Sequence, residues 1–241
     1  MKRISILNFI LLLTIILFMV ACNKNKNYII GGVPEDVNMY KNITSYDVLK
    51  NDPKYDTLIQ IIDAAGFKDK LNKPGVTFFA PSNISIFRYL NARTIQVQKT
   101  NIYAKFAMDS LLYYLSNNIN GTADSLGMYL MDQLLPYSVL TNTGAYYPTE
   151  LAGVKSIVSF EYTKDPSLGY NPLVSSVPQI VYYTYMWKPY TYNLSDANPA
   201  GNITPALGVH TRVITSGIMT KTGIIDELEN GHVLFFYGIK R

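Results

Sequence analysis

The stretch from Gly75 to Leu90 constrains the fold more than any other part of the chain. Its first residues, Val76–Ala80, are β-branched, aromatic or small, which predicts a short buried strand. Pro81 cannot donate a hydrogen bond to a sheet ladder, so the strand is expected to end there. Ser82 or Asn83 can then cap a helix by accepting a hydrogen bond from a free backbone N–H group. The apolar residues of this helix share one side: Ile84, Phe87 and Leu90. The stretch therefore predicts a strand that passes directly into a helix, with both apolar faces turned to one core.

Helical patterns flank this corner on both sides. Ser45–Leu49 and Asp56–Ala65 carry apolar residues at helical spacing before it. After it, Lys105–Leu115 predicts a well-buried helix. Met128–Leu135 predicts a further helix, which Pro136 ends.

Strand patterns dominate the second half of the chain. Val154–Tyr162 alternates apolar and polar residues, and Val181–Trp187 is the next candidate strand. Val213–Leu228 indicates two strands around a turn near Gly223, and Val233–Tyr237 indicates a closing strand. No long helix follows these strands at regular spacing, so parallel βαβ repeats are not expected. The prediction is an α+β fold.

Three motifs resemble those of fasciclin-like domains. The corner reads T-V-F-F-A-P-S-N-I-S-I-F, which is similar to the family signature T-[VF]-F-A-P-[ST]-N-x-A-F. Leu134–Leu140 resembles the L-L-x-Y-H-V-V segment, with Ser138 where the family usually has His. Val213–Leu228 resembles the second motif, with Gly223 at the turn glycine. The motif residues expected to be structural are Thr77, Phe78, Ala80, Pro81, Asn83, Phe87, Tyr137 and Gly223.

The resemblance implies a definite architecture and role. Short helices are expected to pack on a mainly antiparallel β-sheet wedge, within one domain at residues 40–241. The segment at about 160–209 is longer than its counterpart in the family and is expected to be an aromatic-rich insertion before the C-terminal hairpin. Tyr137 is expected to be a packed core tyrosine whose hydroxyl bonds the backbone, rather than a residue that contacts a ligand directly. The family implies binding or adhesion without naming a partner.

The amino terminus has the pattern of an export signal. Met1-Lys2-Arg3 is basic, Ile4–Val20 is nearly all apolar, and Cys22 follows small residues. This resembles the lipobox of bacterial lipoproteins, which predicts a signal peptide at 1–21, lipidation of Cys22 and a flexible tether at 22–39. The alternative is an uncleaved membrane anchor. The combination resembles fasciclin-like lipoproteins of Bacteroidota type, lipid-anchored in the cell envelope, most often at the outer membrane, on its periplasmic or outer surface.

Residues that carry chemistry are few. The chain has two His and one Cys, and neither His210 nor His232 has another ligand at metal-site spacing. Asp226, Glu227 and Glu229 cluster, but are expected to lie in a turn between strands rather than to form an acid pair or a Ca²⁺ site. We therefore expect no metal, no cofactor and no enzyme activity.

The composition favours contact through aromatic side chains rather than charge. Hydrophobic residues make up 48% and charged residues 16%, and there are 20 Tyr. Loss of Lys2 and Arg3 with the signal lowers the formal charge from +4 to +2, which does not suggest nucleic-acid binding. The candidate binding surface comprises Tyr183, Tyr185, Trp187, Tyr190 and Tyr192. The equally weighted alternative is that about half of these rings cover a core.

The sequence as a whole predicts a lipid-anchored, non-enzymatic envelope protein that binds an envelope protein or a surface glycan. The first alternative is a glycan-binding accessory of an outer-membrane uptake system. The third function class is a hydrolase that depends on Asp226.

Overall fold

A computed structural model describes residues 39–188 and 200–239 of the chain. The predicted signal peptide, Cys22 and the tether up to residue 38 lie outside these ranges, as do Tyr190 and Tyr192. The described residues all belong to one compact unit. Within the described ranges, none of the helices combines the length and the apolar character needed to cross a bilayer.

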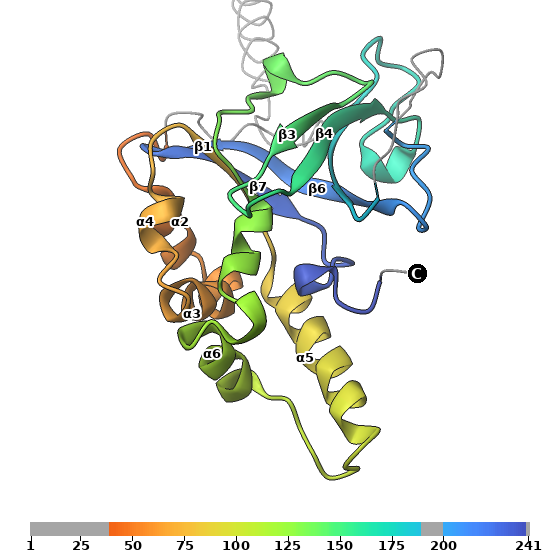
Figure 1. The fold of residues 1–241 in the computed structure, drawn as a ribbon. Helices are drawn as coiled ribbons and strands as arrows, with labels where there is room; N and C mark the ends of the chain where they lie inside the picture. The colour runs from red at the N-terminus through yellow and green to blue at the C-terminus, as the bar shows by residue number, and fades with distance from the viewer. Residues whose placement is uncertain (1–38, 189–199, 240–241) are drawn as a thin grey trace, which may run out of the picture. The chain divides into compact units, whose positions relative to one another are not determined.

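The helices are short and lie mainly in the first half of the described chain. They are α2 (Ser45–Lys50), α3 (Asp56–Ala64), α4 (Lys68–Leu71), α5 (Asn83–Gln98) and α6 (Met108–Ser116). Short 3-10 segments occur at η1 (Pro53–Tyr55), η2 (Ile119–Gly121), η3 (Asp124–Tyr129), η4 (Tyr137–Val139), η5 (Pro166–Leu168) and η6 (Leu234–Phe236). Figure 1 shows α2, α3, α4, α5 and α6 on one side of the sheet.

One mixed sheet forms the other layer, in the order β2-β1-β7-β6-β5-β4-β3. Its strands are β1 (Val76–Ala80), β2 (Leu130–Met131), β3 (Ala145–Pro148), β4 (Lys155–Tyr162), β5 (Gln179–Met186), β6 (Gly208–Met219) and β7 (Gly223–Leu228). Only the β1–β7 pair is parallel; the other described pairs are antiparallel. The predicted α+β fold with short helices on a mainly antiparallel sheet is confirmed.

The strand-to-helix corner forms as predicted. All five residues of β1 are buried, and the hydroxyl of Ser82 caps α5 by accepting a hydrogen bond from the Ser85 N–H group at 3.4 Å. The Asn83 side chain accepts from Thr57 N at 3.0 Å and donates to Pro53 O at 3.1 Å, which ties the start of α5 to η1 and α3. Polar motif residues thus hold the corner together.

Gly223 is needed for a different reason from the one predicted. It is the first residue of β7, paired with Val76 of β1, and it has no left-handed backbone angle. A Cβ atom on Gly223 would lie 2.2 Å from the Val76 carbonyl oxygen. Close approach of two parallel strands, rather than turn geometry, therefore requires glycine here.

The predicted apolar side of α5 is wrong. Phe87 is 62% exposed and Ile84 is also exposed, whereas the buried side consists of Ser85, Ile86 and Tyr89. The Ser82 cap and the Asn83 bonds fix the rotation of the helix, and Tyr89 fills the core at the place that the pattern assigned to Leu90. Tyr89 contacts the rings of Phe106, Phe235 and Tyr237 edge-on.

Two further predicted elements differ. Residues from Met128 to Leu135 do not form a helix; η3 leads instead into β2, which pairs with β1. Val233–Tyr237 forms the turn η6 instead of a strand, with Phe235 and Phe236 in left-handed backbone conformations. This turn places the Phe236 ring parallel to the Tyr185 ring, with centroids 4.7 Å apart, so aromatic packing replaces sheet pairing.

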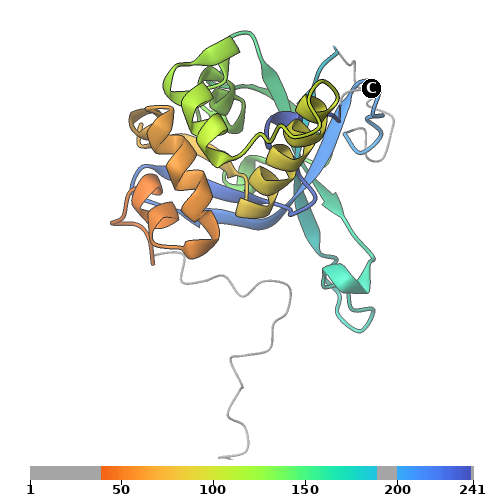
Figure 2. The ribbon, with the colours of Figure 1, turned by 90° about the horizontal axis from the view of Figure 1, so that it is seen from below.

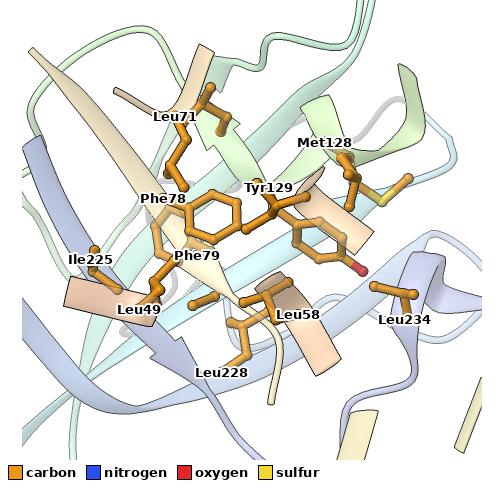
Figure 3. Close-up of a cluster of buried hydrophobic side chains, with 14 of the residues drawn as sticks. Leu49, Leu58, Leu71, Phe78, Phe79, Met128, Tyr129, Ile225, Leu228 and Leu234 are labelled. Atoms are coloured by element: carbon orange, nitrogen blue, oxygen red, sulfur yellow. The ribbon is translucent and has the colours of Figure 1, made fainter. Parts of the chain in front are cut away.

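The core lies between the helices and the sheet. Figure 3 shows Phe78 and Phe79 of β1 among side chains from several helices and from β7. The labelled set is completed by Leu49, Leu58, Leu71, Met128, Tyr129, Ile225, Leu228 and Leu234. Among the described residues, the buried members of this main cluster lie between Tyr46 and Phe236.

Candidate binding surface

The predicted aromatic surface on β5 is largely turned into the protein. Tyr183 is fully buried, and its hydroxyl donates to the Met128 carbonyl oxygen at 2.6 Å while Ser156 Oγ lies 2.8 Å away. Tyr185 is half-buried against Phe236. Tyr183 and Tyr185 share the core-facing side of β5, because residues two apart point to the same face of a sheet. They cannot form the surface that the sequence predicted.

Of the other predicted surface residues, only Trp187 lies in the described ranges, because Tyr190 and Tyr192 are outside them. Trp187 is half-buried beside Tyr185, with ring centroids 6.5 Å apart. Tyr182, on the opposite face of the strand, stacks on His210 at 4.1 Å. The open question of binding surface or core is thus answered in favour of core for Tyr183 and Tyr185.

The acidic cluster has structural partners. Asp226 and Glu227 are buried within β7, not in a turn as predicted. The Asp226 carboxylate accepts from the Gly217 N–H group at 2.7 Å, and burial raises the pKa of Asp226 to about 7. Glu227 accepts from Thr215 Oγ1 at 2.9 Å and pairs with Lys54 at 3.1 Å. A buried carboxyl group that already accepts a hydrogen bond from the backbone of the same protein is poorly placed to reach a substrate.

Both histidines also have internal partners. His232 is buried, its Nε2 lies 2.8 Å from the Tyr129 hydroxyl, and burial lowers the pKa of His232 to about 3. The Tyr129 hydroxyl also accepts from the Phe235 N–H group at 2.7 Å, so it pins η6 to the core. His210 lies 2.7 Å from both Thr184 Oγ1 and Glu161 Oε1. Within the described ranges, no three His, Cys, Asp or Glu side chains are grouped as metal ligands would be.

An exposed aromatic cluster lies on β4, where the sequence analysis assigned no function. Val158, Phe160 and Tyr162 alternate along one face of the strand and change from fully buried, through half-buried, to 59% exposed. Their cross-strand partners on β5 follow the same trend, from buried Tyr183 to half-exposed Gln179. The core face of the sheet therefore continues beyond the layer that covers it.

Tyr137 extends this surface from η4. Its ring centroid lies 5.5 Å from that of Phe160, which in turn lies 5.4 Å from Tyr162. We call Tyr137, Phe160 and Tyr162 the aromatic row. Tyr137 is 42% exposed, so the predicted core role of this residue is wrong. Tyr129 and Tyr183 are buried tyrosines whose hydroxyls bond the backbone.

The β4–β5 hairpin carries the aromatic row outward. Figure 2 shows the end of this hairpin, with η5, extending away from the helices. The loop between the strands has further exposed apolar residues, namely Leu173, Val174 and Val177. Val139, next to the aromatic row on η4, is also exposed. The alternation of apolar and polar residues in β4 predicted which side chains share this face. Which of them are exposed to solvent depends on how far the elements that pack over the sheet extend.

Comparison with known proteins gives a structural likeness to a solved domain pair. No protein-family model matches the chain, and no curated protein matches it. A solved FAS1 domain pair from the insect cell adhesion molecule fasciclin I is similar to 77% of this chain, at 16% identity and a TM-score of 0.40. The match covers 46% of that structure, so this chain corresponds to less than half of its length.

Proposed function

We propose that this chain is a non-enzymatic binding protein of the cell envelope, with an adhesive or protein-binding role, akin to fasciclin-like domains. The observation that carries the proposal is the aromatic row, an apolar sheet face that extends beyond its own core. Tyrosine rings combine a large apolar area with a polar hydroxyl and few rotatable bonds, which suits them to protein interfaces. Half-buried Phe160 supports the two more exposed tyrosines from below.

We further propose that Cys22 carries the lipid that holds this surface at a membrane, most often the outer membrane. The support is the basic start, the apolar segment and the single cysteine that follows it. The partner in this proposal is another envelope protein. A surface glycan is the alternative, since exposed aromatic rings also stack on sugars.

Capture of neighbours on living cells tests the binding role. The full-length protein and the variant Tyr137→Ser/Tyr162→Ser are cross-linked in place, and the captured proteins are identified. Loss of a tyrosine that anchors an interface costs about 2 kcal/mol, or roughly 30-fold in affinity, so the variant should lose its specific neighbour. Tyr113→Ser is the matched control, because Tyr113 is equally exposed (61%) but lies on α6. Equal capture by all three proteins would refute the role of the aromatic row.

Two further measurements test the glycan-binding alternative and the lipidation of Cys22. Saccharide binding by the chain from Asn23 onward, abolished in Trp187→Ala or in the double tyrosine variant, would favour the glycan-binding alternative. Incorporation of labelled palmitate should disappear in Cys22→Ala; unchanged incorporation would rule out lipidation at that residue.

A further inference from the structure

The loop between α5 and α6 contains a turn at residues 101–104, and the two central residues of this turn have apolar side chains. The Ala104 N–H group donates to the Asn101 carbonyl oxygen at 2.9 Å, and the Asn101 side chain accepts from Tyr103 N at 3.1 Å. Ile102 and Tyr103 occupy the two central positions of this turn and are 73% and 93% exposed. Such positions usually carry Gly, Pro, Asn, Asp or Ser, so two large apolar residues there have no local structural reason.

This turn is held in place by the rest of the loop. The Thr94 hydroxyl on α5 accepts from Phe106 N and donates to Phe106 O, both at 3.1 Å, where the chain returns toward α6. The Phe106 ring is buried and packs under the Arg93 guanidinium, 4.4 Å from the ring centroid. In Figure 1 the loop lies at the end of α5 that is farther from the sheet. Ile102 and Tyr103 are thus presented on an anchored projection.

The charged residues in the sequence of this projection are all basic. Between Asp69 and Asp109 the sequence has no acidic residue. Lys99 and Lys105, on either side of the turn, are exposed, and neither has an ion-pair partner among the described residues. Ile95, one helical turn before Lys99, is also exposed.

We propose that this α5 tip, formed by Ile95, Lys99, Ile102, Tyr103 and Lys105, is a contact site for an anionic lipid surface. Aliphatic and aromatic side chains enter the boundary between headgroups and acyl chains, while lysines beside them meet lipid phosphates. A projecting turn needs no concave counterpart on a deformable bilayer, whereas a folded acidic protein would have to supply one. The site goes beyond the proposed function, since it is remote in sequence from the aromatic row and does not require Cys22.

Vesicle co-sedimentation tests this site. The chain from Asn23 onward retains every residue of the main core and lacks the lipid. We expect it to bind phosphatidylcholine vesicles that contain phosphatidylglycerol, with binding that weakens as salt increases. Lys99→Gln/Lys105→Gln should lower this binding by about fivefold for each lysine. Ile102→Ser/Tyr103→Ser should lower it at least as much, because it removes the inserted apolar area.

The controls distinguish this site from general adsorption. Tyr113→Ser removes an exposed tyrosine on α6 and should leave vesicle binding unchanged, as should Tyr162→Ser in the aromatic row. Thermal unfolding should be unchanged in the tip variants, because the substituted side chains are exposed. The proposal is overturned if the wild-type chain ignores anionic vesicles, if it binds neutral vesicles equally well, or if it prefers soluble polyglutamate. A failure of vesicle binding would not affect the proposed role of the aromatic row, which the capture experiment tests independently.

Discussion

At the scale of single residues, Asp226 shows how a buried acid can serve the fold. The β6–β7 pairing is irregular around Thr215 and Ile218, and Gly217 there has a left-handed φ of 75°. Such a bulge leaves a backbone N–H group without its strand partner. The Asp226 carboxyl group accepts that hydrogen bond, which explains its burial without invoking catalysis.

The pKa of Asp226 gives a pH-dependent prediction. Burial raises it to about 7 in the folded protein, so the native state keeps a proton that the unfolded chain releases above about pH 4. The stabilising contribution of that proton is complete at low pH and is lost as the pH rises toward 7. Asp226→Asn keeps the acceptor for Gly217 and cannot ionise. The difference in free energy of unfolding, variant minus wild type, should therefore grow by about 1.4 kcal/mol for each pH unit from 4 to 7.

Urea unfolding at a series of pH values measures this difference. A difference between variant and wild type that stays constant from pH 4 to 8 would contradict the account of Asp226.

Gly223 gives a steric prediction. Gly223→Ala places a methyl group against the Val76 carbonyl oxygen, so β1 and β7 must separate. We expect a loss of about 3 kcal/mol or more in the free energy of unfolding. Gly231→Ala is the control, because the nearest atom to a Cβ there is 3.7 Å away, and it should change stability by less than about 0.5 kcal/mol. Equal effects of the two substitutions in denaturant unfolding would refute the close-approach explanation.

At the scale of elements, α5 offers a comparison between adjacent side chains. Ile86 is fully buried and Phe87 is mostly exposed. Ile86→Ala should cost about 2–5 kcal/mol of stability through the cavity it leaves, while Phe87→Ser should cost about 0.5 kcal/mol or less. Thermal or denaturant unfolding measures both. The reverse order would restore the helix face that the sequence predicted and contradict the structure.

The same helix shows what the sequence could and could not predict. The composition of Val76–Ala80, Pro81 and the polar residues after it specify a strand, a stop and a cap within a few positions, so the corner was predictable. The rotation of α5 depends on Asn83 bonding a segment 26–30 positions away, which no local pattern encodes. The turn at η6 likewise depends on rings from β5 and on the Tyr129 hydroxyl.

At the scale of the whole molecule, the candidate site was harder to predict than the fold. Alternation in β4 and β5 indicated which residues share a face, but both faces contain aromatic residues. Tyr183 is covered by the rings of Phe79, Tyr129 and Phe236, whereas Tyr162 is 59% exposed. The extent of that cover is a property of the assembled chain, so the sequence left surface and core equally weighted for the tyrosines of β5 and did not identify the aromatic row.

Site-specific photo-crosslinking on living cells tests the central claim most directly. A photoreactive phenylalanine analogue replaces Tyr162 in one variant and Tyr113 in a second, and each protein is expressed at its natural location. The account predicts that the probe at position 162 links to one defined envelope protein and that the probe at position 113 does not. The same products from both positions, or none from position 162, would contradict it.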